Sequence, residues 1–537
     1  MKRACMAGPL MLAVHACIMV IPDSPEDACE PGTLLSCYEG PPATRQVGLC
    51  QDGVAVCGEE GELGACEREI GPVLEQCGVD FAEDEDCNGQ TNEHCAHWVA
   101  VYGDIGEQGI EGVSLAAGDD VVVVARNTGG RGGGLINFGG AELYDASWRN
   151  SFAVARIGPE GEHRWSHLFT GGEVVRTAKI ALDETLGVLV TGSFAVDLVY
   201  DGTWQLGGFA TGVDTMFVAR LDGDTGAILD SAAFTHDDFQ IGNAVAGSGD
   251  AVFVAGSSAG YVDLGAAGMF SSAGSTDALL AKLDPDLEPL WARIAGGEGD
   301  DDILRMAVDD AGDVYVVGSF AQSIAFDPCP ALAAQGERDG FVAKLAGGDG
   351  SCTWLRSFGG SGAERVGAIE LGDSMQVAVM FDASIEDGPW HGDSAGDDDI
   401  LIATLDAATG ESLARRTFGA PGDQVVHDLA LLPSGEIAVA GTIRGSIDFG
   451  GGLMKITLQP METEPDDAFV LLLDNQLEHV FSRQFSAPGD DDAFGVVVAE
   501  SGELVVGGEF ANTIDFGTGA QASSGNSVDA YLMRLAP

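Results

Sequence analysis

The sequence predicts an all-β fold: a seven-bladed β-propeller, with four antiparallel strands in each blade, that follows a small disulfide-rich module. Two independent markers give the number of repeats. The residue that ends one β-branched strand recurs at spacings of 61 to 67 residues, as Ala125, Gly192, Gly256, Gly318, Val379, Gly441 and Gly508. A strand related to the pattern Trp-x-x-x-Phe recurs separately and ends at Tyr102, Phe169, Phe234, Ala295, Phe358, Phe418 and Phe485. A fixed period with four strands per unit is typical of blades arranged around an axis.

One repeat, residues 277–326, shows why each unit is a four-stranded sheet. Its strands are Asp277–Leu283, Leu290–Ala295, Ile303–Val308 and Val314–Phe320. All four are short, rich in apolar or β-branched residues, and bounded by Gly, Asp or Pro. None has the length or the period of a helix.

The two ends of the repeat region complement each other. Trp98–Tyr102 is a fourth strand without a preceding third strand, and Asp529–Leu535 is a third strand without a fourth. Because an unpaired strand edge invites aggregation, we expect these two segments to pair. The pairing completes the seventh blade and closes the ring.

Four sequence words in the repeats, DGFVAKL, WLRSFGG, VYVVGSF and SIDFG, resemble the bacterial seven-bladed propeller repeat family of secreted and surface proteins. The resemblance covers about four-fifths of the chain. It implies the fold and a location at the cell surface, and it implies no reaction.

The composition limits the partners. Of 537 residues, 45% are hydrophobic, which suits a folded chain. Lys and Arg number 25 against 85 Asp and Glu, a net charge of −60. So few cations argue against a nucleic-acid partner, since phosphate contacts need clustered cations. An acidic surface favours solubility and affinity for cations.

Residues 1–28 have the pattern of a secretory leader. Lys2 and Arg3 precede the apolar run Ala4–Ile21, and a polar segment follows. Val14-His15-Ala16-Cys17 loosely resembles a bacterial lipobox, although the residues after it are apolar. Two alternatives stay open: a lipid anchor through Cys17, or a protein released after cleavage.

Residues 29–96 predict a disulfide-stapled module. Eight cysteines lie within 67 residues, and after a secretory leader they indicate four bridges whose connectivity the sequence leaves open. The words CYEGPP, VGLCQDG and EDEDCNG resemble the Cys-rich modules at the N-termini of myxobacterial-type surface proteins.

A candidate calcium loop lies inside this module. Its oxygen ligands are predicted to be Asp84, Asp86, Asn88 and Asn92. The spacing matches the start of an EF-hand loop, but position twelve is Cys95 rather than Glu, which leaves a looser Ca²⁺ loop. The alternative is an acidic turn held by Cys87.

A second candidate calcium site lies in the propeller, residues 97–537. The turns that lead into the expected innermost strands carry Glu107, Glu173, Asp237, Asp238, Asp300, Asp301, Asp302, Glu364, Asp423, Asp490, Asp491 and Asp492. Carboxylates gathered at one channel mouth repel each other, which raises pKa values or recruits a cation such as Ca²⁺, and Asp300, Asp301 and Asp302 are the strongest candidates. The alternative is that each Asp caps its own turn and faces water.

Two further patterns in the propeller indicate structural roles. Cys329 and Cys352 belong to one repeat, and in an oxidising compartment we expect them to pair. A cation recurs in the third strand as Arg156, Arg220, Lys282, Lys344 and Arg534. We expect these cations to make contacts between blades.

These patterns favour a non-enzymatic, monomeric binding or display protein that contacts protein, polysaccharide or matrix at the cell surface. The rival class is a periplasmic enzyme, a quinoprotein-like oxidoreductase or a hydrolase. The turns 221–226 and 405–410 resemble those of quinoprotein propellers, but the strands after them begin with Leu229 and Leu413 where that family places a Trp.

Overall fold

The computed structural model describes residues 96–537 except 104–105, 129–133, 146–149, 172–174, 184, 186, 208–212, 235–237, 388–389, 455–464, 486–488, 518–519, 525–526 and 537. Before residue 96 it describes 19–20, 29, 31–38, 45–47, 49–58, 64–66 and 68–70. The chain forms two compact units, Met1–Cys95 and Ala96–Pro537, which are described separately.

The N-terminal unit contains one small sheet of β1 (Met19–Val20), β2 (Leu34–Cys37) and β3 (Gly53–Val56). Disulfides join Cys29 to Cys57 and Cys37 to Cys66. They confirm that the module is stapled by disulfides, and they indicate an extracytoplasmic, oxidising compartment. The lipobox residue Cys17 and the calcium-loop residues Asp84, Asp86, Asn88 and Asn92 lie outside the described residues.

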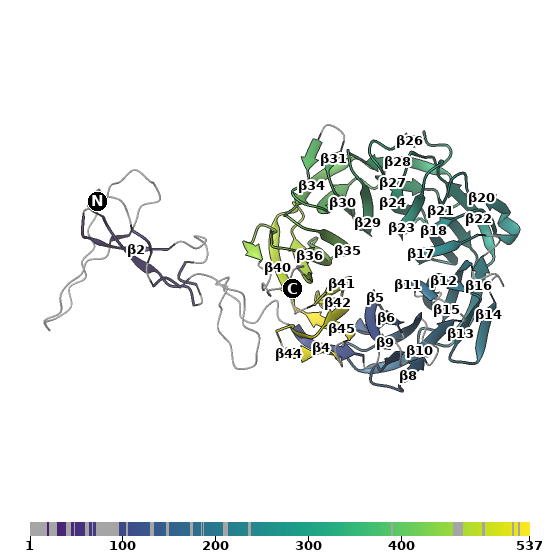
Figure 1. Ribbon diagram of the computed structural model, residues 1–537, viewed down its shortest axis with the longest axis horizontal. Helices are drawn as coiled ribbons and strands as arrows, with labels where there is room; N and C mark the ends of the chain where they lie inside the picture. The colour runs from purple at the N-terminus through teal and green to yellow at the C-terminus, as the bar shows by residue number, and fades with distance from the viewer. Residues whose placement is uncertain are drawn as a thin grey trace. The chain divides into compact units, whose positions relative to one another are not determined.

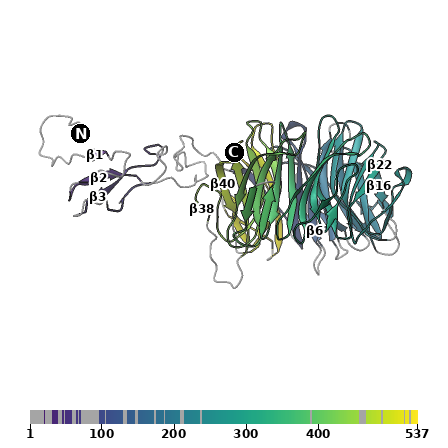
Figure 2. The same ribbon diagram turned by 90° about the horizontal axis from the view of Figure 1, so that it is seen from above.

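Residues 96–537 form seven blades around a central channel (Figure 1), and their strands run from one face of the ring to the other (Figure 2). From blade 1 to blade 7, the innermost strands are β5 (Glu107–Leu115), β11 (Val175–Asp183), β17 (Gln240–Ser248), β23 (Asp301–Val308), β29 (Glu364–Leu371), β35 (Gln424–Leu431) and β41 (Asp492–Val498). The second strands are β6 (Val121–Thr128), β12 (Gly187–Ala195), β18 (Ala251–Ser258), β24 (Val314–Phe320), β30 (Met375–Phe381), β36 (Ile437–Arg444) and β42 (Leu504–Ala511).

The third strands are β9 (Asn150–Ile157), β15 (Asp214–Leu221), β21 (Asp277–Leu283), β27 (Asp339–Leu345), β33 (Asp399–Leu405), β39 (Asp466–Leu473) and β45 (Val528–Leu535). The outer strands are β10 (His163–Gly171), β16 (Ile228–Phe234), β22 (Pro289–Ala295), β28 (Cys352–Phe358), β34 (Ser412–Phe418), β40 (His479–Phe485) and, for blade 7, β4 (Ala96–Tyr102). The predicted fold class is confirmed.

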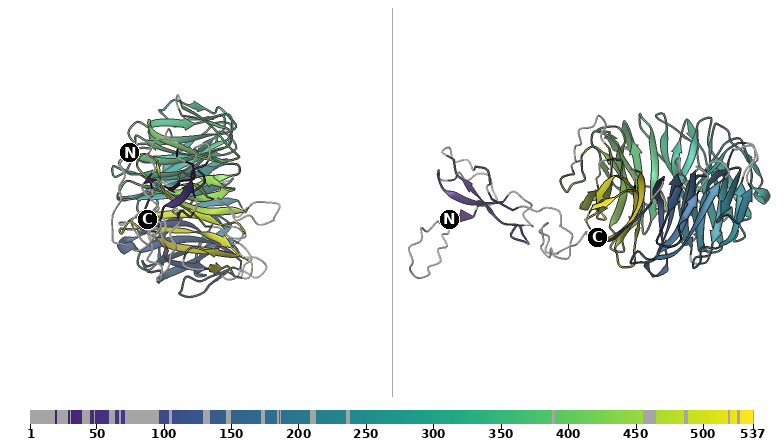
Figure 3. Two further views of the ribbon diagram at one scale, coloured as in Figure 1. Left: turned by 90° about the vertical axis from the view of Figure 1, so that its left-hand side faces the viewer. Right: turned by 60° about the horizontal axis from the view of Figure 1, so that its bottom comes forward.

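Ring closure follows the predicted pairing. β4 is antiparallel to β45, with Trp98 opposite Arg534 and Tyr102 opposite Ala530. The last strands of the chain therefore stand beside the first blade (Figure 3). Because the first strand of the unit completes the last blade, neither β45 nor β4 is left as an isolated strand.

Hairpins connect the second and third strands of the blades. They are β7 (Gly134–Ile136) with β8 (Leu143–Asp145), β13 (Asp197–Tyr200) with β14 (Trp204–Gly207), β19 (Tyr261–Asp263) with β20 (Met269–Ser271), β25 (Ser323–Ile324) with β26 (Leu332–Ala333), β31 (Ser384–Asp387) with β32 (Trp390–Asp393), β37 (Ile447–Asp448) with β38 (Leu453–Met454), and β43 (Thr513–Asp515) with β44 (Ala520–Ala522). The described helices are the short η2 (Ala117–Asp119) and η3 (Gly265–Ala267).

One hairpin changes the expected count of four strands per sheet. β13 of blade 2 pairs with β10 of blade 1, with Phe169 opposite Tyr200, and the first sheet has six strands in the order β14-β13-β10-β9-β6-β5. The hairpin covers the hydrogen-bonding edge of the outer strand. Within the described residues, no helix is long and apolar enough to cross a membrane.

The core consists of seven apolar layers, each between two neighbouring blades. The layer between blades 4 and 5, for example, contains Tyr315, Val342 and Phe358 from one blade and Phe381 and Leu401 from the next. The second strands are buried on both faces: all seven residues of β24 and of β30 are buried. This explains why these strands are continuous apolar runs rather than alternating ones.

The structure confirms the disulfide between Cys329 and Cys352. It joins the loop that precedes β26 to the first residue of β28. In a peptide digest made without reducing agent, we expect mass spectrometry to find a single cross-linked Cys329–Cys352 product. A free thiol at either residue, or a bridge from either to the N-terminal unit, would contradict this pairing.

Candidate binding site at the channel mouth

Each of the seven innermost strands borders the channel, which confirms that strands of the Ile303–Val308 type are innermost. The described turns that lead into them lie at one mouth of the channel, and the predicted rim residues Glu173 and Asp237 lie outside the described residues. At that mouth the carboxylates do not form one exposed ring. Asp301, Glu364 and Asp491 are at most 1% exposed, because the preceding blade covers them, whereas Glu107 at the start of β5 is exposed.

The three adjacent carboxylates of the predicted calcium site turn to different partners. Asp300 accepts a hydrogen bond from the Thr276 hydroxyl at 3.2 Å. Asp301 is buried and accepts backbone N–H groups of Gly297 and Ala321 at 2.8 and 3.0 Å. Asp302 pairs with Arg338 at 3.1 Å. In the part of the chain that the structure describes, no three His, Cys, Asp or Glu side chains converge to hold a metal ion. The calcium site stays a prediction.

Arginines on neighbouring segments offset part of the acidic charge at this mouth. Arg365 pairs with Asp398 at 2.7 Å, and Arg126 pairs with Glu111 at 3.2 Å and with Glu509. Sequence reasoning looked for cations only inside the acidic turns. The ion pairs instead reach across strands, and a scan of the turns alone does not find them.

A cavity of about 310 Å³ opens at this mouth beside blades 5, 6 and 7. It is lined by Asp398, Asp423, Val425, His427, Thr442, Arg444, Asp466 and Asp492. Arg444 holds Asp466 in a bidentate pair at 2.9 and 3.0 Å and also pairs with Asp423. Four carboxylates therefore face one lining cation, and the cavity suits hydroxyl groups or cations.

A chain of hydrogen bonds forms the inner wall of the cavity. The Thr442 hydroxyl donates to Asp492 at 2.5 Å, and His427 Nε2 lies 3.0 Å from the same hydroxyl. Burial lowers the pKa of His427 to about 3, so the ring is neutral and Nε2–H donates to Thr442. Burial raises the pKa of Asp492, while the Thr442 hydrogen bond opposes that rise. This wall presents a fixed acceptor to a ligand.

Below the mouth, three charged side chains occupy one level of the channel. Lys179, Arg305 and Asp428 take the same register position in blades 2, 4 and 6. The equivalent residues of the other blades are Gly112, Ala244, Ala368 and Gly495. Small residues in alternate blades leave room for three long side chains in the narrow centre of the ring.

Two of these charged side chains form hydrogen bonds with a neighbouring blade. Lys179 donates to the carbonyl of Glu111 at 3.2 Å, and Asp428 accepts the backbone N–H of Val496 at 3.0 Å. Burial, and then the charge of Arg305, lower the pKa of Lys179 to about 8. Burial, and then the charge of Asp428, raise the pKa of Glu370 to about 8. Sequence reasoning missed this level, although charged residues inside otherwise small and apolar innermost strands were a signal for it.

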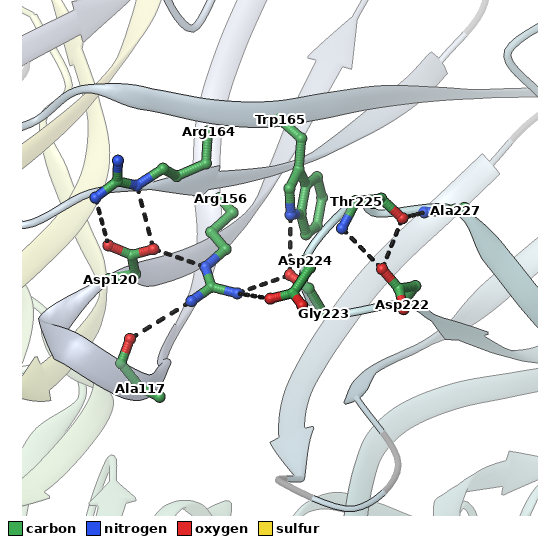
Figure 4. A network of polar contacts seen from close by, with 10 residues as sticks. All are labelled: Ala117, Asp120, Arg156, Arg164, Trp165, Asp222, Gly223, Asp224, Thr225 and Ala227. Carbon is green, nitrogen blue, oxygen red and sulfur yellow. Dashed lines mark hydrogen bonds and ion pairs between the residues drawn. The ribbon is translucent and has the colours of Figure 1, made fainter.

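Three of the five recurring third-strand cations, Arg156, Lys282 and Arg534, act between blades as expected, whereas Lys344 pairs within its own blade with Asp309 at 3.3 Å and Asp313 at 3.2 Å. Arg156 and the Trp165 indole both donate to the carbonyl of Gly223 in the next blade, at 2.8 and 3.0 Å (Figure 4). Arg534 and Trp98 converge in the same way on Pro159 at 3.2 and 2.7 Å. Lys282 and Trp291 converge on Gly347 at 2.7 and 3.3 Å. We call each such set a blade clamp: a cation, an indole and one carbonyl of the following blade.

Contacts between blades also explain the two turns that resemble those of quinoprotein propellers. Gly226 and Gly410, in the left-handed region at φ 69° and 72°, lie against the indoles of Trp165 and Trp354 from the preceding blade. A Cβ at either glycine would approach the ring within 3 Å. The turns therefore receive a Trp from the neighbouring blade, and their role in this structure is to join blades.

No protein-family model matches the chain, and no curated protein matches its sequence. Among solved structures, the chain is similar to BamB from Moraxella catarrhalis, with 13% identity, 81% of this chain and 100% of that chain covered, and a TM-score of 0.35. It is similar to the C-terminal WD40 domain of Sif2, with 9% identity, 81% and 98% covered, and a TM-score of 0.36. It is also similar to the quinohemoprotein alcohol dehydrogenase of Comamonas testosteroni, with 10% identity, 81% and 76% covered, and a TM-score of 0.36. At such low identities and TM-scores, these similarities assign the chain to no family and indicate nothing about a ligand.

Proposed function

We propose that the protein is a non-enzymatic binding protein of the bacterial envelope, secreted or anchored at the cell surface. In this proposal it is a member of the bacterial seven-bladed propeller repeat family, and its Cys-rich module is of the myxobacterial type. The propeller is a monomeric scaffold for contact with a protein, a polysaccharide or a matrix component, and calcium assists the contact.

The acidic cavity at the channel mouth is the observation that supports this proposal most directly. Its wall combines the fixed acceptor Asp492 with the ion pairs of Arg444, and these groups can bind ligand hydroxyl or cationic groups without a chemical step. The channel below it is occupied by Lys179, Arg305 and Asp428, whose contacts serve the ring itself.

The test is a binding screen with the full-length protein on glycan arrays and in pull-downs from cell-envelope fractions. Any ligand found is then titrated against Asp492→Asn, which removes one charge and keeps the acceptor for Thr442. Asp310→Asn, on the exposed turn at the other end of β23, is the matched control. We expect affinity to fall on the order of tenfold in Asp492→Asn alone, which corresponds to about 1.4 kcal/mol. Equal affinity of both variants would place the ligand elsewhere.

The calcium part of the proposal has its own test. We expect calorimetric titration of the full-length protein with CaCl₂ to give a saturable heat, because hard oxygen ligands on turns suit Ca²⁺. The heat should persist in Asp310→Asn and fall in Asp492→Asn or in the triple Asn variant of Asp300, Asp301 and Asp302. Absence of saturable heat at millimolar calcium would mean that the acidic mouth is only solvated.

A further inference from the structure

At several blade junctions, the first residue of an innermost strand donates its N–H to the residue that precedes the third strand of the previous blade, which sets the first residues of the two strands beside each other. At three successive junctions these pairs are Asp301 with Asp277, Glu364 with Asp339, and Gln424 with Asp399, and all six residues are at most 2% exposed. Between blades 4 and 5, a parallel bridge joins Arg338 to Ala363, and the Glu364 N–H donates to the Arg338 carbonyl at 2.9 Å. This bridge sets Asp339 and Glu364 side by side.

The neighbouring junctions show how this buried position is normally satisfied. In blade 4, the short side chain of Asp301 accepts two backbone N–H groups, those of Gly297 and Ala321. In blade 6, Gln424 Oε1 accepts the Ala420 N–H at 3.0 Å, and its Nε2 donates to the Gly422 carbonyl at 3.0 Å. The position therefore takes either a carboxylate with two donors or an amide that brings its own donor.

Glu364 has only a weak form of the first solution: the backbone N–H groups of Gly360 and Gly362 act to lower its pKa, but neither makes a hydrogen bond of good geometry. Both of its carboxylate oxygens are buried without a hydrogen-bond partner, and so is Oδ2 of Asp339, whose Oδ1 accepts the Gln335 N–H at 2.9 Å. If Glu364 and Asp339 are both ionised, these three buried oxygen atoms lose their hydration without gaining a hydrogen bond, which has a large free-energy cost. What the junction lacks is a donor in good hydrogen-bond geometry.

The other charged groups around Glu364 do not supply that donor. Asp382, which faces it from the end of β30, is an acid whose Oδ1 accepts the Ala363 N–H at 2.8 Å. The two nearest arginines in the chain point away: Arg338 pairs with Asp302, and Arg365 pairs with Asp398. The surroundings thus add negative charge, which disfavours a second carboxylate ion.

We propose that Glu364 is held as the neutral acid and donates its O–H to Oδ2 of Asp339, which joins blades 4 and 5 by a carboxylic acid–carboxylate hydrogen bond. The proton takes the place of the Gln424 amide donor. The alternative acceptor, the Gly362 carbonyl, already accepts the Glu337 N–H at 2.8 Å, whereas Asp339 Oδ2 is anionic and unpartnered. Hydrogen bonds of this O–H···O⁻ kind are short and strong.

This bond makes the junction sensitive to alkali. Burial, and then the charge of Asp339, raise the pKa of Glu364 to about 8 from an ordinary value of 4.5. Between these pH values the folded chain keeps a proton that the unfolded chain has lost, so stability falls as pH rises through this window. The contribution is complete below the ordinary pKa and is lost above the raised one, where two like charges meet between the blades.

The test compares the melting temperature of the full-length wild type with that of Glu364→Gln between about pH 5 and about pH 9. Because the amide carries its own donor at every pH, we expect the variant to melt within about a degree of wild type at the acid end and several degrees above it at the alkaline end. Glu386→Gln, which removes an exposed charge from the nearby β31, is the matched control, and its difference from wild type should not change with pH.

Two outcomes would overturn the proposal. One is a difference between wild type and Glu364→Gln that is the same at every pH. The other is a rise in the melting temperature of wild type, but not of the variant, when calcium is added at alkaline pH, since the pair would then hold a cation rather than a proton. If Glu364→Gln fails to fold, Asp339→Asn provides a second measurement. Its amide can donate to an ionised Glu364, so its difference from wild type should also grow with pH, whereas a constant loss would reject the shared proton.

Discussion

A propeller that begins at residue 104 should fail to form a stable monomer, whereas one that begins at Ala96 should fold. The shorter chain lacks β4 and exposes the edge of β45, which is paired with β4 from Trp98 to Tyr102. It also loses the apolar contacts of Trp98, Val99, Val101 and Tyr102 with the last apolar layers. Tyr102 is buried and the other three are half-buried. Since a fully buried large side chain contributes roughly 1.5–3 kcal/mol, the loss is a large part of the free energy of unfolding of a typical domain.

Size-exclusion chromatography and thermal melting of the two truncated chains measure this effect. We expect the chain from residue 104 to elute as aggregate, because an open edge pairs with other molecules. A monomer with the melting temperature of the longer chain would mean that β4 contributes nothing to the ring. The chain from Ala96 also controls for removal of the N-terminal unit, which both truncated chains lack.

Arg534→Met should cost roughly 3 kcal/mol in the free energy of unfolding. The Arg534 side chain is 6% exposed and pairs with Glu503 at 2.8 Å and Asp119 at 3.0 Å. It also donates to the Pro159 carbonyl in the blade clamp between blades 7 and 1. Methionine fills the space but leaves two partly buried carboxylates without their cation. Both carboxylates keep some contact with water, which places the cost at the lower end of the range for broken buried pairs.

Arg164→Met is the matched control for this prediction. Arg164 also touches two carboxylates, Asp120 and Glu162, but its side chain is 44% exposed, so we expect a much smaller loss than that of Arg534→Met. Urea unfolding of both variants and of wild type gives the two losses directly. Equal losses would show that the Arg534 clamp is no stronger than a surface ion pair.

The period of the repeats and the incomplete units at the two ends of the repeat region were sufficient to predict the number of blades and the pairing of β4 with β45. Local patterns also gave the Cys329–Cys352 bridge, because both residues belong to one repeat. These features follow from strand length, turn residues and the need to cover sheet edges. All of these can be recognised from residues that are close together in the sequence.

Features that depend on contacts between blades were harder to predict. Glu364 aligns with Asp301 and was expected at the exposed rim, yet the preceding blade buries it, and a sequence pattern says nothing about which surface a neighbouring repeat covers. The charged level of Lys179, Arg305 and Asp428 was missed for a related reason. Three residues about two repeats apart meet only because the ring brings alternate blades to one axis, and the register depends on a bulge in each strand.

The position of β4 also determines when the last blade can form during synthesis of the chain. During synthesis, residues 96–102 are made more than 400 residues before their partner β45, so the outer strand of the seventh blade stays unpaired until β45 follows. Contacts this distant in sequence form slowly, and intermediates that await them expose apolar surface. A chain interrupted anywhere before β45 therefore leaves the seventh blade unfinished and β4 unpaired. The ring closes only once β45 has been made, and until then the propeller lacks the protection of a closed structure.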